Sequence, residues 1–192
     1  MTTLLLRRIE PPEATANSPS NVTGPSARLL HPASDRSFLE VAELRAVAEG
    51  LAVSAIAWPG MNHPTRRVWD IMVASDAFEA WVIAWPPGGA IELHDHGESS
   101  GAVVVASGEL TETKVTRDSD GLVQMETTVL PAGAGTTFEP PNVHDLVNGG
   151  TVPAISVHTY APRLTAMTHY DMANRRLVPG RTVRYRLGAP IP

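Results

Sequence analysis

The chain contains no cysteine. This absence excludes disulfide bonds and thiolate metal ligands, so histidine and carboxylate side chains must bind any metal. A thiol that takes part in the chemistry must therefore come from a substrate. A strong excess of one charge is also lacking, because the formal net charge is −5 and the basic residues are scattered. The chain thus shows no electrostatic footprint of a nucleic-acid-binding protein.

Long hydrophobic runs are also missing, and none approaches the length that spans a membrane. The apolar run at residues 4–6 is too short for the core of a signal peptide, and its two arginines follow it instead of preceding it. We therefore expect a cytoplasmic protein without a membrane partner. The 192 residues, of which 43% are hydrophobic and 18% charged, suit one domain with a sizeable core.

Residues 1–34 are predicted to form an extended N-terminal arm, because residues 11–34 are rich in Pro, Ser, Asn and Ala and lack hydrophobic periodicity. Residues 35–192 are predicted to form the folded domain. The stretch from Ser37 to Glu40 has the form of a capping box, which predicts a helix that ends at Gly50. This helix is expected to pack against the outside of a sheet.

From Phe78 onward the hydrophobic pattern indicates strands. Residues 78–85 carry large apolar side chains on both faces, which is typical of a strand inside a sandwich. Further strands are predicted at residues 101–107, 109–117, 122–130, 136–138, 143–147, 154–160, 165–170 and 181–187, with a hairpin turn at residues 118–121. Many short strands, Gly/Pro turns and one clear helix indicate an all-β sandwich or barrel.

The stretch from Pro86 to Gly97 places two histidines, His94 and His96, just after a glycine-rich turn. In an extended strand these two side chains point to the same face. Two imidazoles on one face form half a site for a divalent metal. The best third ligand is His144, which follows a second Pro/Gly turn. We therefore predict a three-histidine metal site built from two separated strands.

These two half-motifs resemble those of the cupin superfamily, and the fit is closer to the thiol dioxygenases, particularly the bacterial cysteine dioxygenase type. The matching stretches, within residues 65–171, are 94–97, 101–110, 143–145 and 156–167. The resemblance implies a cupin-type double-stranded β-helix, or jelly-roll barrel, with a small N-terminal helical segment. It also implies that an Fe(II) enzyme oxidises a small carboxylate-bearing thiol with O2 to a sulfinic acid. L-cysteine is the leading substrate and 3-mercaptopropionate the runner-up.

The ligand set differs from that of most cupins, which add a glutamate a few residues after the second histidine. Here Ser100 and Gly101 occupy those positions, and Glu98 comes too early. Three neutral ligands leave Fe(II) its full positive charge and three open positions, which favours an anionic ligand such as a thiolate. Three imidazoles also suit Zn, Ni, Cu or Co.

The resemblance also implies a Ser-His-Tyr relay over the metal, which maps onto Ser156, His158 and Tyr160. These alternate residues are predicted to share one strand face. Animal members of the family cross-link a cysteine to this tyrosine. In this chain Gly101 stands at the matching position and no cysteine exists, so the cross-link cannot form.

Family members hold the substrate carboxylate with an arginine upstream of the HxH strand. The candidates here are Arg66 and Arg67, although another alignment register places Asp70 or Ile71 in that position. Arg163, near the relay, is a further candidate.

Two alternatives of other classes stay open. One is a cupin that binds a metal or small ligand without turnover, and the other is a cupin isomerase or carbon dioxygenase that uses another divalent metal. The missing glutamate and the Ser-His-Tyr strand count against the latter.

Overall fold

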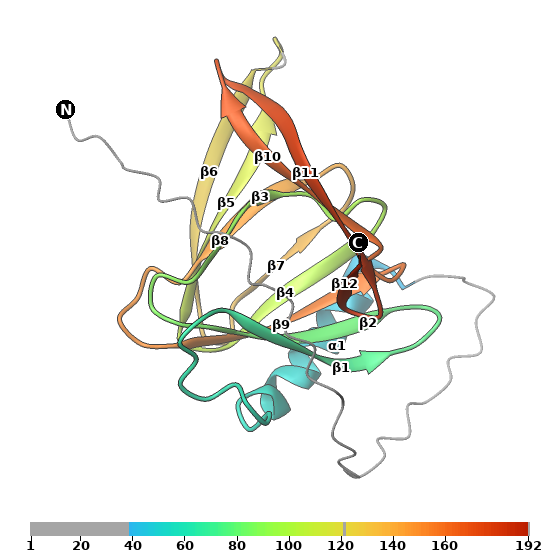
Figure 1. Cartoon of the computed structure of the whole chain (residues 1–192), viewed down its shortest axis with the longest axis vertical. Coiled ribbons are helices and arrows are strands. Elements are labelled where there is room, and N and C mark those ends of the chain that lie inside the picture. The colour runs from blue at the N-terminus through green and yellow to red at the C-terminus, as the bar shows by residue number, and fades with distance from the viewer. Residues whose placement is uncertain (1–38, 121, 192) are drawn as a thin grey trace. The chain divides into compact units, whose positions relative to one another are not determined.

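The computed structural model describes residues 39–120 and 122–191 (Figure 1). In this part of the chain one helix, α1 (Val41–Ala55), precedes a series of strands. The strands are β1 (Val68–Ala74), β2 (Glu79–Trp85), β3 (Ala90–His94), β4 (Ser100–Ser107), β5 (Glu109–Arg117), β6 (Val123–Pro131), β7 (Gly135–Phe138), β8 (Val143–Val147), β9 (Ala154–Ala161), β10 (Ala166–Ala173), β11 (Arg176–Arg186) and β12 (Ala189–Ile191). They form two antiparallel sheets, which confirms the all-β, cupin-type prediction.

The strand order brings distant parts of the sequence together. One sheet has the order β1-β2-β9-β4-β7 and the other β12-β11-β10-β3-β8-β5-β6 (Figure 1). The main core contains side chains from both sheets, such as Trp81 and Tyr160 from the first and Leu110 and Leu146 from the second. Because β3 pairs with β8, the two predicted histidine motifs lie on neighbouring strands.

The second strand, β2, is buried on both faces, as its sequence predicts. Trp81 and Trp85 belong to the main core. Val82 and Ala84 point the other way, into an apolar cluster that includes Ala48 of α1. The helix therefore covers the outer face of the five-stranded sheet, as expected.

The two ends of α1 differ from the prediction. Its first turn is capped by Glu43, whose carboxylate accepts a hydrogen bond from the backbone N–H of Glu40 at 2.9 Å. The helix continues through Gly50 to Ala55, because Leu51, Ala52 and Ala55 pack on the apolar cluster. This burial outweighs the roughly 1 kcal/mol that an interior glycine costs. The predicted capping box runs from Ser37 to Glu40, and its first two residues, like the predicted arm at residues 1–34, lie outside the described residues.

Two strands were not predicted. The segment of β1 shows no clean alternation, and its residues are mostly half-buried at the edge of the five-stranded sheet. The short β12 pairs only with β11, which itself begins at Arg176 instead of the predicted residue 181. No helix among the described residues has both the length and the apolar character to cross a membrane.

Candidate metal centre

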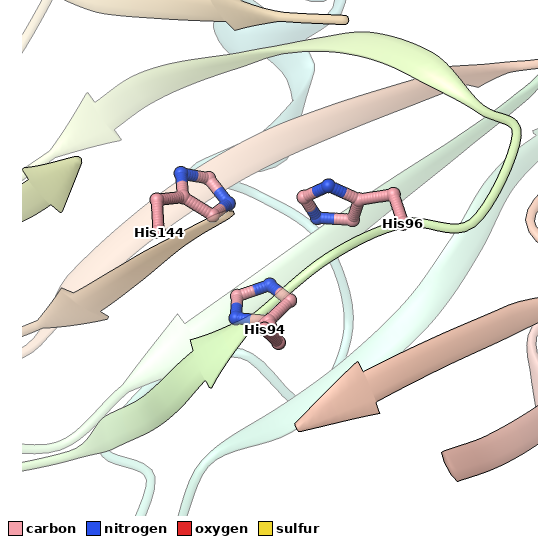
Figure 2. Close-up of side chains that lie close together, drawn as sticks. All are labelled: His94, His96 and His144. Atoms are coloured by element: carbon pink, nitrogen blue, oxygen red, sulfur yellow. The ribbon is translucent and has the colours of Figure 1, made fainter. Parts of the chain in front are cut away.

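Three histidine side chains converge in the interior (Figure 2). His94 is the last residue of β3 and lies opposite His144 of β8 in the strand register. His96 follows two residues later in the loop. All three are buried, and their candidate ligand atoms lie within 4.8 Å of one another. The structure therefore brings together the three residues that the sequence predicts.

The HxH pair is not a single strand, which corrects the prediction. β3 ends at His94, and the chain turns at Gly97, which has a φ of +58°. Asp95 holds this turn, because its Oδ1 accepts hydrogen bonds from the backbone N–H groups of Gly97 at 3.1 Å and Thr168 at 3.0 Å. The turn still directs both imidazoles inward, with ring centroids 4.8 Å apart.

The hydrogen bonds of the rings leave nitrogen atoms available for a metal. His94 Nδ1 donates to the carbonyl oxygen of Glu92 at 2.8 Å, and His144 Nδ1 lies 2.6 Å from Glu112 Oε1. His144 Nε2 and His96 Nδ1 are buried without a hydrogen-bond partner. A buried unsatisfied polar atom costs about 1–3 kcal/mol. A divalent cation bound among the three rings would satisfy the lone pair of His144 Nε2, so the cluster fits a metal.

The protonation state also suits metal binding. Burial lowers the pKa of His94 and of His96 well below the ordinary histidine value, and the neighbouring histidines lower both further. Neutral imidazole is the form that binds a metal. Within the described part of the chain the cluster contains no carboxylate, and Glu98 is exposed.

A small cavity of about 30 Å³ opens beside His94. Its polar lining comes from Arg67, His158, Tyr160 and Tyr185 in addition to His94. The apolar lining consists of Trp69, Trp81, Ile83, Trp85, Ile91, Leu146 and Met167. Among the described residues no acidic side chain lines it. The cavity next to the histidine cluster therefore has mostly apolar walls and one cationic side chain, that of Arg67.

The structure separates the two candidate arginines. Arg67 precedes β1 and lines the cavity, and its guanidinium carbon lies 5.3 Å from the centre of the Trp85 ring. Burial lowers the pKa of Arg67, but a guanidinium stays protonated in proteins. In the described region no carboxylate forms a salt bridge with it. Arg66 is exposed, so only Arg67 presents a charge to the cavity.

The other candidates for this position lie outside the cavity. Asp70 is exposed and accepts a hydrogen bond from Trp58 Nε1 at 2.9 Å. Ile71 packs against the main core. Arg163 lines a separate groove together with Leu187. The alternative register is therefore not supported by the geometry.

The three relay residues lie on one face of β9 and are buried. Ser156 Oγ lies 2.8 Å from His158 Nε2, and Tyr160 Oη lies 3.5 Å from His158 Nδ1. Trp85 extends the chain, because its Nε1–H donates to Ser156 Oγ at 2.9 Å. Burial lowers the pKa of His158 to about 3 and raises the pKa of Tyr160. The relay is therefore uncharged at neutral pH.

Gly101 lies opposite Tyr160 in the pairing of β4 with β9. A Cβ atom at this position would clash with the carbonyl oxygen of Thr159 and with the ring of Phe138. The Phe138 ring in turn stacks on His96, with centroids 4.0 Å apart. An aromatic ring thus leaves no room for a side chain at the position where animal family members carry the cross-linking cysteine.

The family model for cysteine dioxygenase type I matches residues 13–173. The chain belongs to the cysteine dioxygenase type I family. The match begins well before the stretch at 65–171 on which the resemblance rested. Membership in this family and the histidine cluster together identify a metal-dependent cupin, and the family implies a small-molecule substrate and O2.

Solved structures are similar to this member of the cysteine dioxygenase family over about half of its length. A Thermus thermophilus protein is 22% identical over 53% of this chain and 88% of that chain, with a TM-score of 0.45. An oxalate oxidase is 18% identical over 53% of this chain and 54% of its own, with a TM-score of 0.45. An uncharacterized Klebsiella pneumoniae protein with a double-stranded beta-helix domain is 26% identical over 53% and 79%, with a TM-score of 0.42.

Two residues next to the site of this cysteine dioxygenase family member were not predicted from the sequence. Tyr185 lines the cavity from β11, and its ring lies 5.5 Å from that of Trp81. Glu112 of β5 is buried beside His144 of β8. Its position two residues after Leu110, which belongs to the core, was an available signal, because alternate residues of a strand share a face.

Proposed function

We propose that this protein is an Fe(II)-dependent thiol dioxygenase that adds both atoms of O2 to the sulfur of a small carboxylate-bearing thiol, most directly L-cysteine, to give the sulfinic acid. The observation that carries the proposal is a buried cluster of three imidazoles beside a cavity lined by Arg67, an arginine that has no carboxylate partner among the described residues. Iron, when bound, would supply a Lewis acid that favours the thiolate and the redox chemistry that activates O2. A cytoplasmic location, where thiols stay reduced, fits this reaction.

Arg67 is the proposed carboxylate-binding residue. A half-buried guanidinium that has no carboxylate partner among the described residues is costly, and an anionic ligand relieves this cost. A guanidinium can also bind both oxygens of a carboxylate, which fixes the orientation of the substrate. Tyr185 borders the same cavity, and its hydroxyl is the proposed second donor to that carboxylate.

Trp85 sets the direction of the proposed relay. An indole N–H only donates, so Ser156 Oγ accepts from Trp85 and its own proton is free to point at His158 Nε2. No other acceptor for that buried hydroxyl lies among the described residues. His158 then carries its proton on Nδ1, which faces the oxygen of Tyr160. This arrangement leaves the Tyr160 proton free to donate to the substrate or to dioxygen in the cavity.

The decisive experiment is oxygen consumption by the Fe(II)-loaded protein with four thiols: L-cysteine, 3-mercaptopropionate, cysteamine and 2-mercaptoethanol. We expect equimolar loss of thiol and O2 and a sulfinate product with one or both carboxylate thiols, and little uptake with the other two. The absence of an acidic group from the described cavity lining makes 3-mercaptopropionate the alternative substrate. Iron binding without oxygen uptake for any thiol would indicate a cupin without turnover.

The change Arg67→Ala is expected to raise KM for the carboxylate thiol about 10- to 100-fold, since a hydrogen bond to a charged group contributes about 1.5–3 kcal/mol. The rate of the slow oxygen uptake with cysteamine should change much less. Arg66→Ala is the matched control, because this neighbouring arginine is exposed. Equal effects of Arg67→Ala on both thiols would mean that the arginine is structural, and Arg163 would be tested next.

A further inference from the structure

The buried carboxylate of Glu112 lies directly behind one of the three histidines. Its Oε1 is 2.6 Å from His144 Nδ1, and the two side chains are only 3% and 1% exposed. Strand pairing explains the contact, since Lys114 is opposite His144 in the register of β5 with β8. Glu112 is therefore a diagonal neighbour of His144. Because a carboxylate oxygen accepts, Nδ1 carries the proton and Nε2 keeps its lone pair.

A positive charge balances the second oxygen of this carboxylate. Lys114 Nζ lies 3.9 Å from Glu112 Oε2 and donates to the carbonyl oxygen of Thr137 at 2.9 Å. Burying a carboxylate is expensive unless it is paired and hydrogen-bonded. Glu112 thus places a carboxylate, with a lysine beside its second oxygen, one hydrogen bond away from the histidine cluster.

We propose that Glu112 is a positioning residue, which holds His144 with Nε2 available to the metal and makes its imidazole a stronger donor. This inference rests on the metal site of the proposed function and adds a carboxylate to it. Most cupins place a glutamate among the metal ligands, whereas the three ligands here are neutral. Glu112 supplies the negative charge from behind a ligand instead. A carboxylate that hydrogen-bonds a metal-binding histidine fixes the ring and raises its basicity.

Metal affinity of the purified protein tests this role without reference to turnover. Glu112→Gln keeps the size of the side chain and removes its charge, and Glu112→Asp keeps the charge and shortens the side chain. We expect both to raise the dissociation constants for Zn(II) and Co(II) about 10- to 100-fold, the range typical of such partners. We also expect a shift in the visible absorption of bound Co(II). The matched control is Glu109→Gln, an exposed glutamate on the same strand.

The outcomes separate this inference from the proposed function. Wild-type affinity and an unchanged Co(II) spectrum in both Glu112 variants would overturn the positioning role and leave the metal site intact. A wild-type protein that binds neither metal would overturn the metal site itself. A measurement on the wild-type protein tests the same role even if the Glu112 variants fail to fold. In the Zn(II)-loaded protein, nitrogen-15 NMR should show a proton on His144 Nδ1 and the metal on Nε2, and the reverse assignment would overturn the inference.

Discussion

Replacing His94, His96 or His144 by alanine is expected to remove most of the bound iron and to lower oxygen uptake at least about a hundredfold. Loss of a residue that hydrogen-bonds a metal ligand already lowers metal affinity or activity about 10- to 100-fold. Loss of a ligand itself should lower them further. The three side chains are buried with their candidate ligand atoms within 4.8 Å of one another, and among the described residues no fourth ligand belongs to this cluster that could replace the missing one. Iron content per chain and oxygen uptake are measured for each variant.

Another buried histidine, which belongs neither to the cluster nor to the relay, provides the matched control. His169 of β10 lies opposite His94 in the strand register, and their ring centroids are 6.1 Å apart. It does not belong to the cluster of candidate ligands. The change His169→Ala should therefore leave the iron content near that of the wild type. Full iron occupancy in all three cluster variants, or loss of iron only in the His169 variant, would contradict the assignment.

The sequence was sufficient to predict that His94, His96 and His144 lie together, because the relevant signals are local. The short spacing of His94 and His96 makes their two rings converge even though β3 ends between them. The turn before His144 marks the start of a strand, and the alternate spacing of the relay residues places them on one face of β9. Each of these inferences uses only the order of residues in one segment.

The remaining features depend on pairing between distant strands, which one segment does not encode. The choice of Arg67 over Arg66 follows from the antiparallel pairing of β1 with β2, which sets Arg67 next to Trp85. The absence of space at Gly101 depends on Phe138, which reaches it from β7 across the β4 pairing. Glu112 meets His144 only because β5 and β8 are neighbours. Strand order was not available from the sequence, so these contacts could not be predicted.

The hydroxyl of Tyr160 is expected to contribute to the chemical step and not to metal binding. Tyr160→Phe should keep near-normal iron content, because the phenol is not part of the histidine cluster. Turnover should fall on the order of tenfold to a thousandfold, the range typical of losing one positioned acid, base or hydrogen-bond donor. Burial raises the pKa of Tyr160, so the hydroxyl keeps its proton and acts as a donor throughout the neutral range. Iron content, kcat and KM are measured together.

The control and the mass of the protein complete this test. Thr127→Val removes the hydroxyl of an exposed residue on β6, which lies 3.5 Å from Thr113 Oγ1 and does not border the cavity, so turnover should change little. The intact mass of the wild type should equal that of the plain sequence, because the chain has no cysteine to cross-link with Tyr160. If Tyr160→Phe turns over like the wild type, the hydrogen bonds from Trp85 through Ser156 and His158 stabilise the core of β9 and serve no catalytic purpose.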